Sequence, residues 1–460
     1  MERWQGAALD YLPRWIEHQM RLGGQPGVTI AAAFKGRPVL DVALGKADAV
    51  RGSDLTPRHR FRVASHSKTF TAAGIMTLRE RGRLSLDDAA GKYVSGLHPA
   101  VAKATISQLL SHTAGLIRDG EDSGQWQDRR PFADETQLRR DLATAPAIEA
   151  NTRFKYSNHG FGLLGLIIEA LTGERYKRWI AKTILAPAGL EHTYPDMPLP
   201  RGVPIARGHT GRLPVTPRLV IPGLNPTNAL APATGFISTA GDLARFFSSL
   251  DPGASRSLLS KASRREMTRP QWRNPNSAIE RYYGLGTMSG TTAGWDWLGH
   301  AGGFQGFLTR TAHLPEIGLT LSILTNGADG PSWPWLDGAF HILRKFHQTG
   351  APSGRARNWT GRWWTLWGAT DLVPMGNKVI VADPSLGNPF MDCGEITVAR
   401  AGEGRITLVQ GYASYGEKAK RQPATGRARE IWLGGVKLVP EAPLADEMKA
   451  RYAPSSGRRR

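Results

Sequence analysis

The segment from Phe61 to Phe70 reads FRVASHSKTF and leads into a helical pattern of small and apolar residues that runs to Leu78. It places Ser65 three residues before Lys68, at the expected start of that helix. Residues three apart share one face of a helix, so the two side chains are expected to lie side by side. A serine hydroxyl needs an adjacent base, and a lysine can serve when burial or nearby positive charge lowers its pKa. The segment therefore predicts an activated nucleophile, although a helix cap followed by a surface lysine has the same pattern.

Two later motifs carry polar groups next to expected structural elements. Tyr156-Ser157-Asn158 precedes a helical pattern expected to begin near Phe161, and it offers a phenol and an amide together. His300-Ala301-Gly302-Gly303 precedes a predicted pair of strands, and its glycines would let a substrate backbone lie along the strand edge. The structural alternatives are a turn with a buried tyrosine and an asparagine cap, and a structural histidine.

The order of the predicted elements indicates the fold class. Residues 27–45 predict two strands around a turn, and residues 307–314 and 319–324 predict a second strand pair. Between them, residues 87–217 are mostly helical in pattern. This order favours an α+β fold, with one sheet built from both ends of the segment and a helical lobe between.

The pattern changes near residues 348–357 (QTGAPSGRAR), which have the composition of a linker. We expect a first domain over residues 1–347 and a small antiparallel β domain over residues 358–460, with a frayed basic tail. Its short strand-like runs are residues 359–367, 378–382, 395–399, 405–410 and 430–439.

Composition excludes several classes of protein. The chain has 460 residues, of which 40% are hydrophobic and 21% are charged, as in ordinary globular proteins. The net charge is +20, but the basic residues are scattered along the chain. The sequence has no aromatic-plus-basic RNA-binding signature and no Cys/His spacing of a zinc finger, so no nucleic acid is expected as a partner. The longest apolar run is too short to span a membrane, and the N-terminal residues do not resemble a secretory signal, which favours a cytoplasmic protein. With Cys393 as its single cysteine, the chain can form no internal disulfide and no cysteine-based metal site.

Together, the S-x-x-K, Y-x-N and H-x-G motifs resemble those of the penicillin-recognising serine hydrolases. The resemblance is strongest to class C β-lactamases, D-aminopeptidases and related esterases, and it covers most of the first 345 residues. It implies a β-lactamase-like antiparallel sheet flanked by helices, with a helical lobe and an active site between the two. The phrases that carry it are residues 61–70, 106–116, 156–165, 233–246 and 319–327.

The resemblance also implies a role for each matching residue. Ser65 would be the nucleophile that forms an acyl-enzyme, with Lys68 and Tyr156 as alternative bases that titrate as a coupled pair. Asn158 would bind the substrate amide. The resemblance implies neither a metal nor a cofactor.

The third motif departs from the K-T-G triad of the family. The backbone N–H groups of Ser65 and Gly303 would form the oxyanion hole, and His300-Ala301-Gly302 would take the place of K-T-G. The fixed positive charge and the threonine hydroxyl that would grip a substrate carboxylate are therefore missing. This difference disfavours a β-lactamase or a carboxypeptidase and fits the esterases and aminopeptidases of the family.

The sequence thus predicts a serine hydrolase that cleaves an ester or amide bond of a small molecule, of the esterase or D-aminopeptidase/amidase type. The alternative within the same chemistry is a β-lactamase or D,D-peptidase. An alternative of another class is a catalytically silent binding protein on the same fold, whose basic surface would bind an anionic partner. The oligomeric state has no signal in the sequence.

Overall fold

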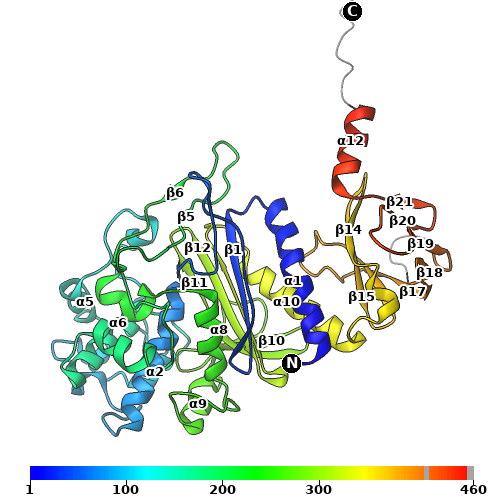
Figure 1. Cartoon of the computed structure of the whole chain (residues 1–460). Helices are drawn as coiled ribbons and strands as arrows, with labels where there is room; N and C mark the ends of the chain where they lie inside the picture. Colours follow the sequence, from blue (N-terminus) through cyan, green and yellow to red (C-terminus); the bar gives the residue numbers. More distant parts are fainter. Residues whose placement is uncertain (409–413, 453–460) are drawn as a thin grey trace, which may run out of the picture. The chain divides into compact units, whose positions relative to one another are not determined.

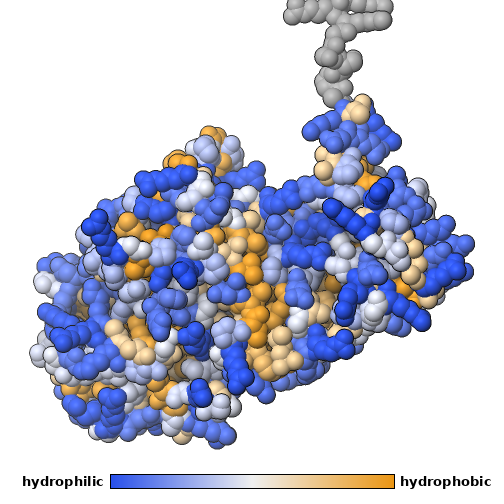
Figure 2. Space-filling view, in the orientation of Figure 1, coloured by the Kyte–Doolittle hydropathy of each residue, from blue (hydrophilic) through white to orange (hydrophobic). Residues whose placement is uncertain are grey.

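The structure is a computed structural model that describes residues 1–408 and 414–452. The described chain divides into two compact units, one formed by residues 24–336 and the other by residues 1–23 together with residues 337–460 (Figure 1). The tail that we expect to be frayed, residues 455–460, lies outside the described residues. Hydrophilic residues cover most of the face seen in Figure 2. Within the described ranges, no helix has both the length and the apolar composition needed to cross a membrane.

The unit of residues 24–336 is built on a nine-stranded antiparallel sheet with the order β3-β2-β1-β13-β12-β11-β10-β9-β8. Strand β1 pairs with β2 on one side and with the late strand β13 on the other, which confirms the predicted α+β sheet. The run GVTIAAAF in β1 is buried almost throughout, as expected for a strand covered on both faces. The strands are β1 (Gly27–Phe34), β2 (Arg37–Asp48), β3 (Ser53–Asp54), β8 (Trp272–Arg273), β9 (Arg281–Tyr283), β10 (Met288–Thr292), β11 (Trp295–Phe304), β12 (Phe307–Leu314) and β13 (Leu319–Thr325).

Helices of the same unit form the lobe beside the sheet, and α8 packs against β1, β12 and β13. At Gly165, an added methyl group would lie 2.4 Å from Cγ of Pro232, so the segment η6 packs directly on α6. The helices are α2 (Ser67–Glu80), α3 (Pro99–Ala102), α4 (Ile106–Leu110), α5 (Glu135–Leu142), α6 (Asn158–Thr172), α7 (Tyr176–Ile180), α8 (Ala240–Ser249) and α9 (Lys261–Thr268). Short segments that matter for the site are η1 (Ala64–His66), η6 (Ala231–Gly235), β4 (Phe61–Arg62) and β7 (Ile237–Ser238).

The second unit contains an eight-stranded antiparallel sheet of consecutive strands, β14 to β21. The backbones of Trp364 in β14 and Val439 after β21 exchange two hydrogen bonds of 2.7 and 3.0 Å, which join the first strand to the end of the last. This arrangement confirms the small antiparallel barrel predicted for the C-terminal region. The strands are β14 (Gly361–Thr365), β15 (Gly368–Met375), β16 (Lys378–Ala382), β17 (Gly394–Arg400), β18 (Glu403–Leu408), β19 (Lys418–Gln422), β20 (Glu430–Leu433) and β21 (Val436–Leu438). The helices are α10 (Ser332–Thr349), which crosses the boundary between the units, α11 (Gly354–Arg357) and α12 (Glu441–Tyr452).

Helix α1 (Arg3–Leu22) belongs to the unit that contains the barrel. The hydroxyl of Tyr11 donates to Oδ2 of Asp371 at 3.0 Å, and Arg362 binds both oxygens of the same buried carboxylate at 2.8 Å. Nε1 of Trp15 also donates to the carbonyl oxygen of Leu386 at 3.2 Å. This division differs from the predicted one, which places α1 in a domain of residues 1–347, and a boundary within residues 348–357 stays a prediction.

Candidate active site

Ser65 lies in η1, between the short strand β4 and the helix α2. The segment is held by the pairing of β4 with β7 and by a 3.0 Å hydrogen bond from the N–H of Val63 to the carbonyl oxygen of Phe236. Ala64 has a φ of 45°, in the left-handed region that costs a non-glycine residue about 1–2 kcal/mol. Backbone strain of this kind concentrates at functional sites, and here it precedes the predicted nucleophile directly.

Four of the predicted residues form one connected hydrogen-bond network that includes the hydroxyl of Ser65. Oγ of Ser65 lies 3.2 Å from Nζ of Lys68 and accepts a 2.8 Å hydrogen bond from the phenol of Tyr156. The amine of Lys68 also donates to Oδ1 of Asn158 at 2.7 Å and to the carbonyl oxygen of Ala233 in η6 at 2.8 Å. The structure therefore brings together side chains from η1, α2, the loop before α6 and the start of α6 itself.

The environment of Lys68 favours its neutral form. Its side chain is fully buried, and this burial lowers its pKa well below the usual value; Asp119 opposes the shift and Arg118 adds to it. A neutral amine has two N–H donors and one lone pair. Because Asn158 and Ala233 supply two acceptors, the lone pair is left for Ser65. In this state Lys68 can take the proton of the serine hydroxyl.

Tyr156 complements this arrangement as a donor. Burial raises the pKa of its phenol well above the usual value, so the group stays protonated in the free protein. Since the phenol donates to Oγ of Ser65, the serine's own proton remains available to Lys68. The two candidate bases thus hold different positions in the resting hydrogen-bond network.

The loop that carries Tyr156 is fixed by His112. Nδ1 of His112 accepts a 3.1 Å hydrogen bond from the N–H of Ser157, and its ring centroid lies 4.1 Å from that of Tyr156. Ser157 caps α6 by accepting from the N–H of Gly160 at 2.9 Å. The helix therefore begins at Asn158 rather than near Phe161, because a serine supplies the cap.

The amide of Asn158 has a second partner that the sequence analysis missed. Its Nδ2 donates to Oδ1 of Asp119 at 2.5 Å, and Oδ2 of Asp119 lies 3.0 Å from Nε of Arg118. Asp119 belongs to a loop with no recognisable motif, so no local signal could have identified it. Both the oxygen and the nitrogen of the Asn158 amide therefore have hydrogen-bond partners within the chain.

The third motif lies on β11, where one side of the strand is open. Met288 at the start of β10 pairs with Gly299, and no strand of the described residues pairs with 300–304 on that side. An added methyl group at Gly302 would lie 2.1 Å from the carbonyl oxygen of Val63, whereas one at Gly303 would meet only Cδ2 of Leu308 at 3.3 Å. Gly302 thus permits close contact with the segment that carries the nucleophile.

His300 is buried and its ring nitrogens have partners within the chain. Nε2 lies 2.9 Å from the hydroxyl of Tyr283, and Nδ1 lies 2.7 Å from the carbonyl oxygen of Ala301. Burial, with a smaller contribution from His66, lowers the pKa of His300 well below its usual value. His300 is therefore an uncharged imidazole at neutral pH.

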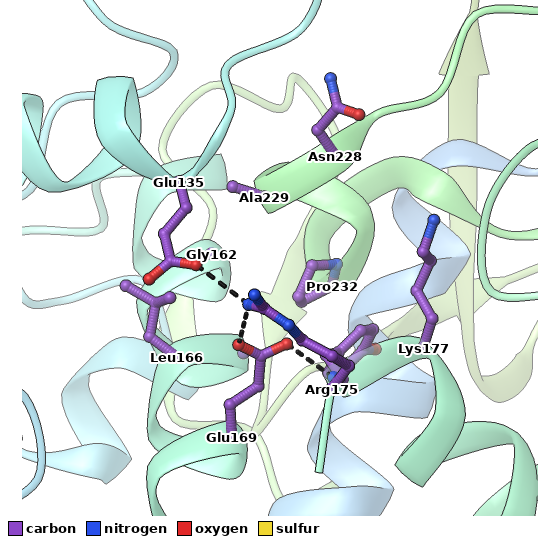
Figure 3. A pocket seen from close by; sticks show the side chains of 11 residues that line it. Glu135, Gly162, Leu166, Glu169, Arg175, Lys177, Asn228, Ala229 and Pro232 are labelled. Atoms are coloured by element: carbon purple, nitrogen blue, oxygen red, sulfur yellow. Dashed lines mark hydrogen bonds and ion pairs between the residues drawn. The ribbon is translucent and has the colours of Figure 1, made fainter. Parts of the chain in front are cut away.

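A separate cavity of about 330 Å³ lies against α6 and η6 and includes none of the predicted site residues (Figure 3). Figure 3 shows Arg175 reaching toward two acidic side chains, and its Nη1 lies 3.2 Å from Glu135 and 3.4 Å from Glu169. The charged side chains that line this cavity therefore largely neutralise one another.

The chain is similar to several known proteins in sequence and in fold. Protein flp of Staphylococcus aureus (strain COL) is 33% identical over 189 residues, a match that covers 39% of this chain and only 36% of flp. A D-stereospecific amidohydrolase from Streptomyces sp. is 27% identical, with a TM-score of 0.60 over 73% of this chain and 98% of the other. The penicillin-binding protein homologue from Pyrococcus abyssi is 21% identical and shares the fold over 94% of this chain and 99% of its own, with a TM-score of 0.64.

The predicted resemblance is confirmed at the level of the family. The sequence model of the β-lactamase family matches residues 12–334, which is more than two thirds of the chain. That segment contains every residue of the S-x-x-K, Y-x-N and H-x-G motifs. The chain belongs to the β-lactamase family.

Proposed function

We propose that this protein is a serine hydrolase that cleaves an ester or amide bond of a small molecule through an acyl-enzyme on Ser65. The observation that carries the proposal is the position of Oγ of Ser65 between the amine of Lys68 and the phenol of Tyr156. A binding protein without turnover would have no need to bury a lysine beside a serine in this way, because burial of an amine is costly.

The network supports Lys68 as the first base. Oγ of Ser65 attacks the substrate carbonyl carbon while its proton passes to Nζ of Lys68, and the oxyanion is held by the backbone N–H groups of Ser65 and Gly303. Collapse of this intermediate breaks the bond to the leaving group, which takes a proton from Tyr156, and Lys68 replaces that proton. Water then attacks the acyl-enzyme, gives up its proton through the same pair, and releases Ser65.

The arrangement around His300 bears on the kind of substrate. An uncharged imidazole in the first place of the triad attracts a free carboxylate weakly, so substrates without a carboxylate at that position are favoured. The open side of β11 supports binding of an extended acyl group that carries an amide. The similarity to a D-stereospecific amidohydrolase makes amides of D-amino acids the first substrates to examine.

The test combines labelling and turnover. A fluorophosphonate should label the wild-type protein at Ser65 and leave Ser65→Ala unlabelled. A panel of p-nitrophenyl esters, D- and L-amino-acid amides and a chromogenic cephalosporin should show hydrolysis of an ester or amide that Ser65→Ala lacks. Loss of a nucleophile typically costs several orders of magnitude, so activity of Ser65→Ala within about tenfold of wild type would contradict the proposal. Cephalosporin hydrolysis that rivals ester hydrolysis would instead identify a β-lactamase.

A further inference from the structure

A chain of polar contacts connects the protein surface with the nucleophile. It begins at Arg118, whose side chain is 61% exposed and whose Nε lies 3.0 Å from Oδ2 of Asp119. Asp119 is buried, and its other oxygen accepts from Nδ2 of Asn158 at 2.5 Å. Oδ1 of Asn158 then accepts from Lys68, which contacts Ser65. The carboxylate of Asp119 therefore stands two contacts away from the amine of Lys68.

The chemistry of a carboxylate makes this contact directional. An ionised carboxylate only accepts hydrogen bonds, whereas an amide has a donating end and an accepting end. Asp119 thus selects the orientation of Asn158 in which the NH₂ group faces the carboxylate and the oxygen faces Lys68. In the opposite orientation, the NH₂ group would face Lys68 and compete with the hydroxyl of Ser65 for the lone pair of the amine.

We propose that Asp119 is a positioning residue that fixes the amide of Asn158 and thereby keeps the lone pair of Lys68 directed at Ser65, and that its ion pair with Arg118 balances the charge around the amine. The inference rests on the proposed function, since it assigns Lys68 as the base. It adds to the S-x-x-K and Y-x-N motifs a carboxylate that belongs to neither.

The charged groups near Lys68 make the proposal testable by pH. Burial keeps the neighbouring side chains of Tyr156, His112 and His300 uncharged, because it raises the pKa of the phenol and lowers those of both imidazoles. Arg118 and Asp119 act in opposite directions, since the arginine lowers the pKa of Lys68 and the aspartate raises it. Removing the charge of Asp119 should therefore lower the pKa of Lys68, and removing the charge of Arg118 should raise it.

The first experiment compares two isosteric changes in one loop. Asp119→Asn replaces a carboxylate, which can only accept, with an amide that can also donate, so the orientation of Asn158 is no longer fixed. We expect kcat and the rate of fluorophosphonate labelling to fall together by about tenfold to 10²-fold, as for a misplaced catalytic group. The control is Asp122→Asn, which removes an exposed carboxylate that accepts from the N–H of Gly124 at 2.8 Å and lies 3.2 Å from Arg130. It should leave both rates near those of the wild type. A wild-type rate in Asp119→Asn would overturn the proposal.

The second experiment follows kcat/KM against pH. Its acidic limb reports loss of the proton from Lys68, so Asp119→Asn should move that limb to lower pH and Arg118→Gln should move it to higher pH. Because the side chain of Arg118 is largely exposed, Arg118→Gln carries this measurement even if Asp119→Asn lowers the melting temperature. An unmoved limb in Arg118→Gln, or shifts of the same sign in both variants, would contradict the inference. A wild-type protein that neither labels nor hydrolyses any substrate would instead contradict the proposed function.

Discussion

Gly302 lies directly against the backbone carbonyl of Val63, at a distance that leaves no room for a methyl group. Val63 precedes the nucleophile by two residues, and Gly302 belongs to the strand whose open side faces away from β12. The contact therefore fixes the position of η1 relative to β11. The H-x-G motif can lie this close to the segment that carries the S-x-x-K motif because Gly302 has no side chain.

We expect Gly302→Ala to lower kcat by about 10²-fold, because the added methyl group must push η1 away from β11 and displace Ser65. The measurement is the steady-state rate together with fluorophosphonate labelling of Ser65. Gly241→Ala on α8, where a methyl group would meet Oδ2 of Asp41 at an ordinary 3.6 Å, is the matched control and should keep the wild-type rate. If both glycine variants are equally active, the close contact does not position the nucleophile.

Tyr156→Phe removes the phenol that donates to Ser65 and leaves the ring packed on His112. We expect the rate to fall by about 10²-fold or more, the scale of a general acid–base contribution. The loss should be greater for an amide than for a p-nitrophenyl ester, because an amine leaving group needs a proton and p-nitrophenolate does not. Unchanged kinetics with both substrates would make Tyr156 a packing residue and leave Lys68 to act alone.

The preference for substrates with a carboxylate should not change over about pH 6 to 8, because His300 is already uncharged there and protonates only at lower pH. His300→Lys places at the same position an amine whose usual pKa is about four units above that of an imidazole, so it should raise the relative kcat/KM of a carboxylate-bearing substrate. The measurement is kcat/KM for a matched pair of substrates, with and without the carboxylate, on both proteins. A ratio that rises in the wild type as the pH falls from 8 to 6 would show that His300 titrates in this range.

Stability should decrease as the pH falls below about 6.5. Burial lowers the pKa of His66 to about 4, so between these values the unfolded chain binds a proton that the folded protein excludes. For His66 the loss amounts to roughly 3 kcal/mol when the pH reaches 4. We expect the melting temperature of His66→Gln to depend less steeply on pH than that of the wild type, with the exposed His192→Gln as control. Parallel curves for all three proteins would rule out His66 as a source of the acid sensitivity.

The buried carboxylate of Asp371 should be important for the unit that contains the barrel. Asp371→Ala leaves the guanidinium of Arg362 without its partner, and breaking a buried pair in this way typically costs about 3–5 kcal/mol. In the same unit, Glu403→Gln removes one member of an exposed pair with Arg400 and should cost at most about 1 kcal/mol. Denaturant unfolding followed by tryptophan fluorescence measures both. Similar losses in the two variants would mean that the buried pair contributes no more than a surface one.

Much of the fold could be predicted because its strands carry local signals. The paired strands β1 and β2, and β12 and β13, are apolar or β-branched runs separated by glycine-containing turns, and both pairs are present. Strand β19 was missed because its inward positions are Ala419 and Arg421, which produce no apolar alternation. Strand β15 was missed because it contains Asp371 and Pro374, two residues that usually interrupt strands.

The candidate site likewise contains residues that local sequence patterns identify and residues that they do not. Ser65, Lys68, Tyr156 and Asn158 could be found from motif spacing alone, and the structure brings them into contact. The role of Asp119 depends on a contact between positions 39 residues apart, and the contact of Tyr283 with His300 joins two different strands. Contacts of this kind are created by the tertiary fold, so no local pattern records them.

The hydrogen bond between Tyr11 and Asp371 joins positions that are 360 residues apart in the chain. At a synthesis rate of about 5–20 residues per second, the helix α1 leaves the ribosome roughly 20–70 seconds before its partner exists. During that interval Nε1 of Trp15 also lacks its acceptor, the carbonyl oxygen of Leu386. The unit of residues 24–336 is synthesised completely in the meantime, so its folding can precede that of the unit that encloses it in sequence. The docking of α1 is thus a late, non-local step in the folding of the unit that contains the barrel.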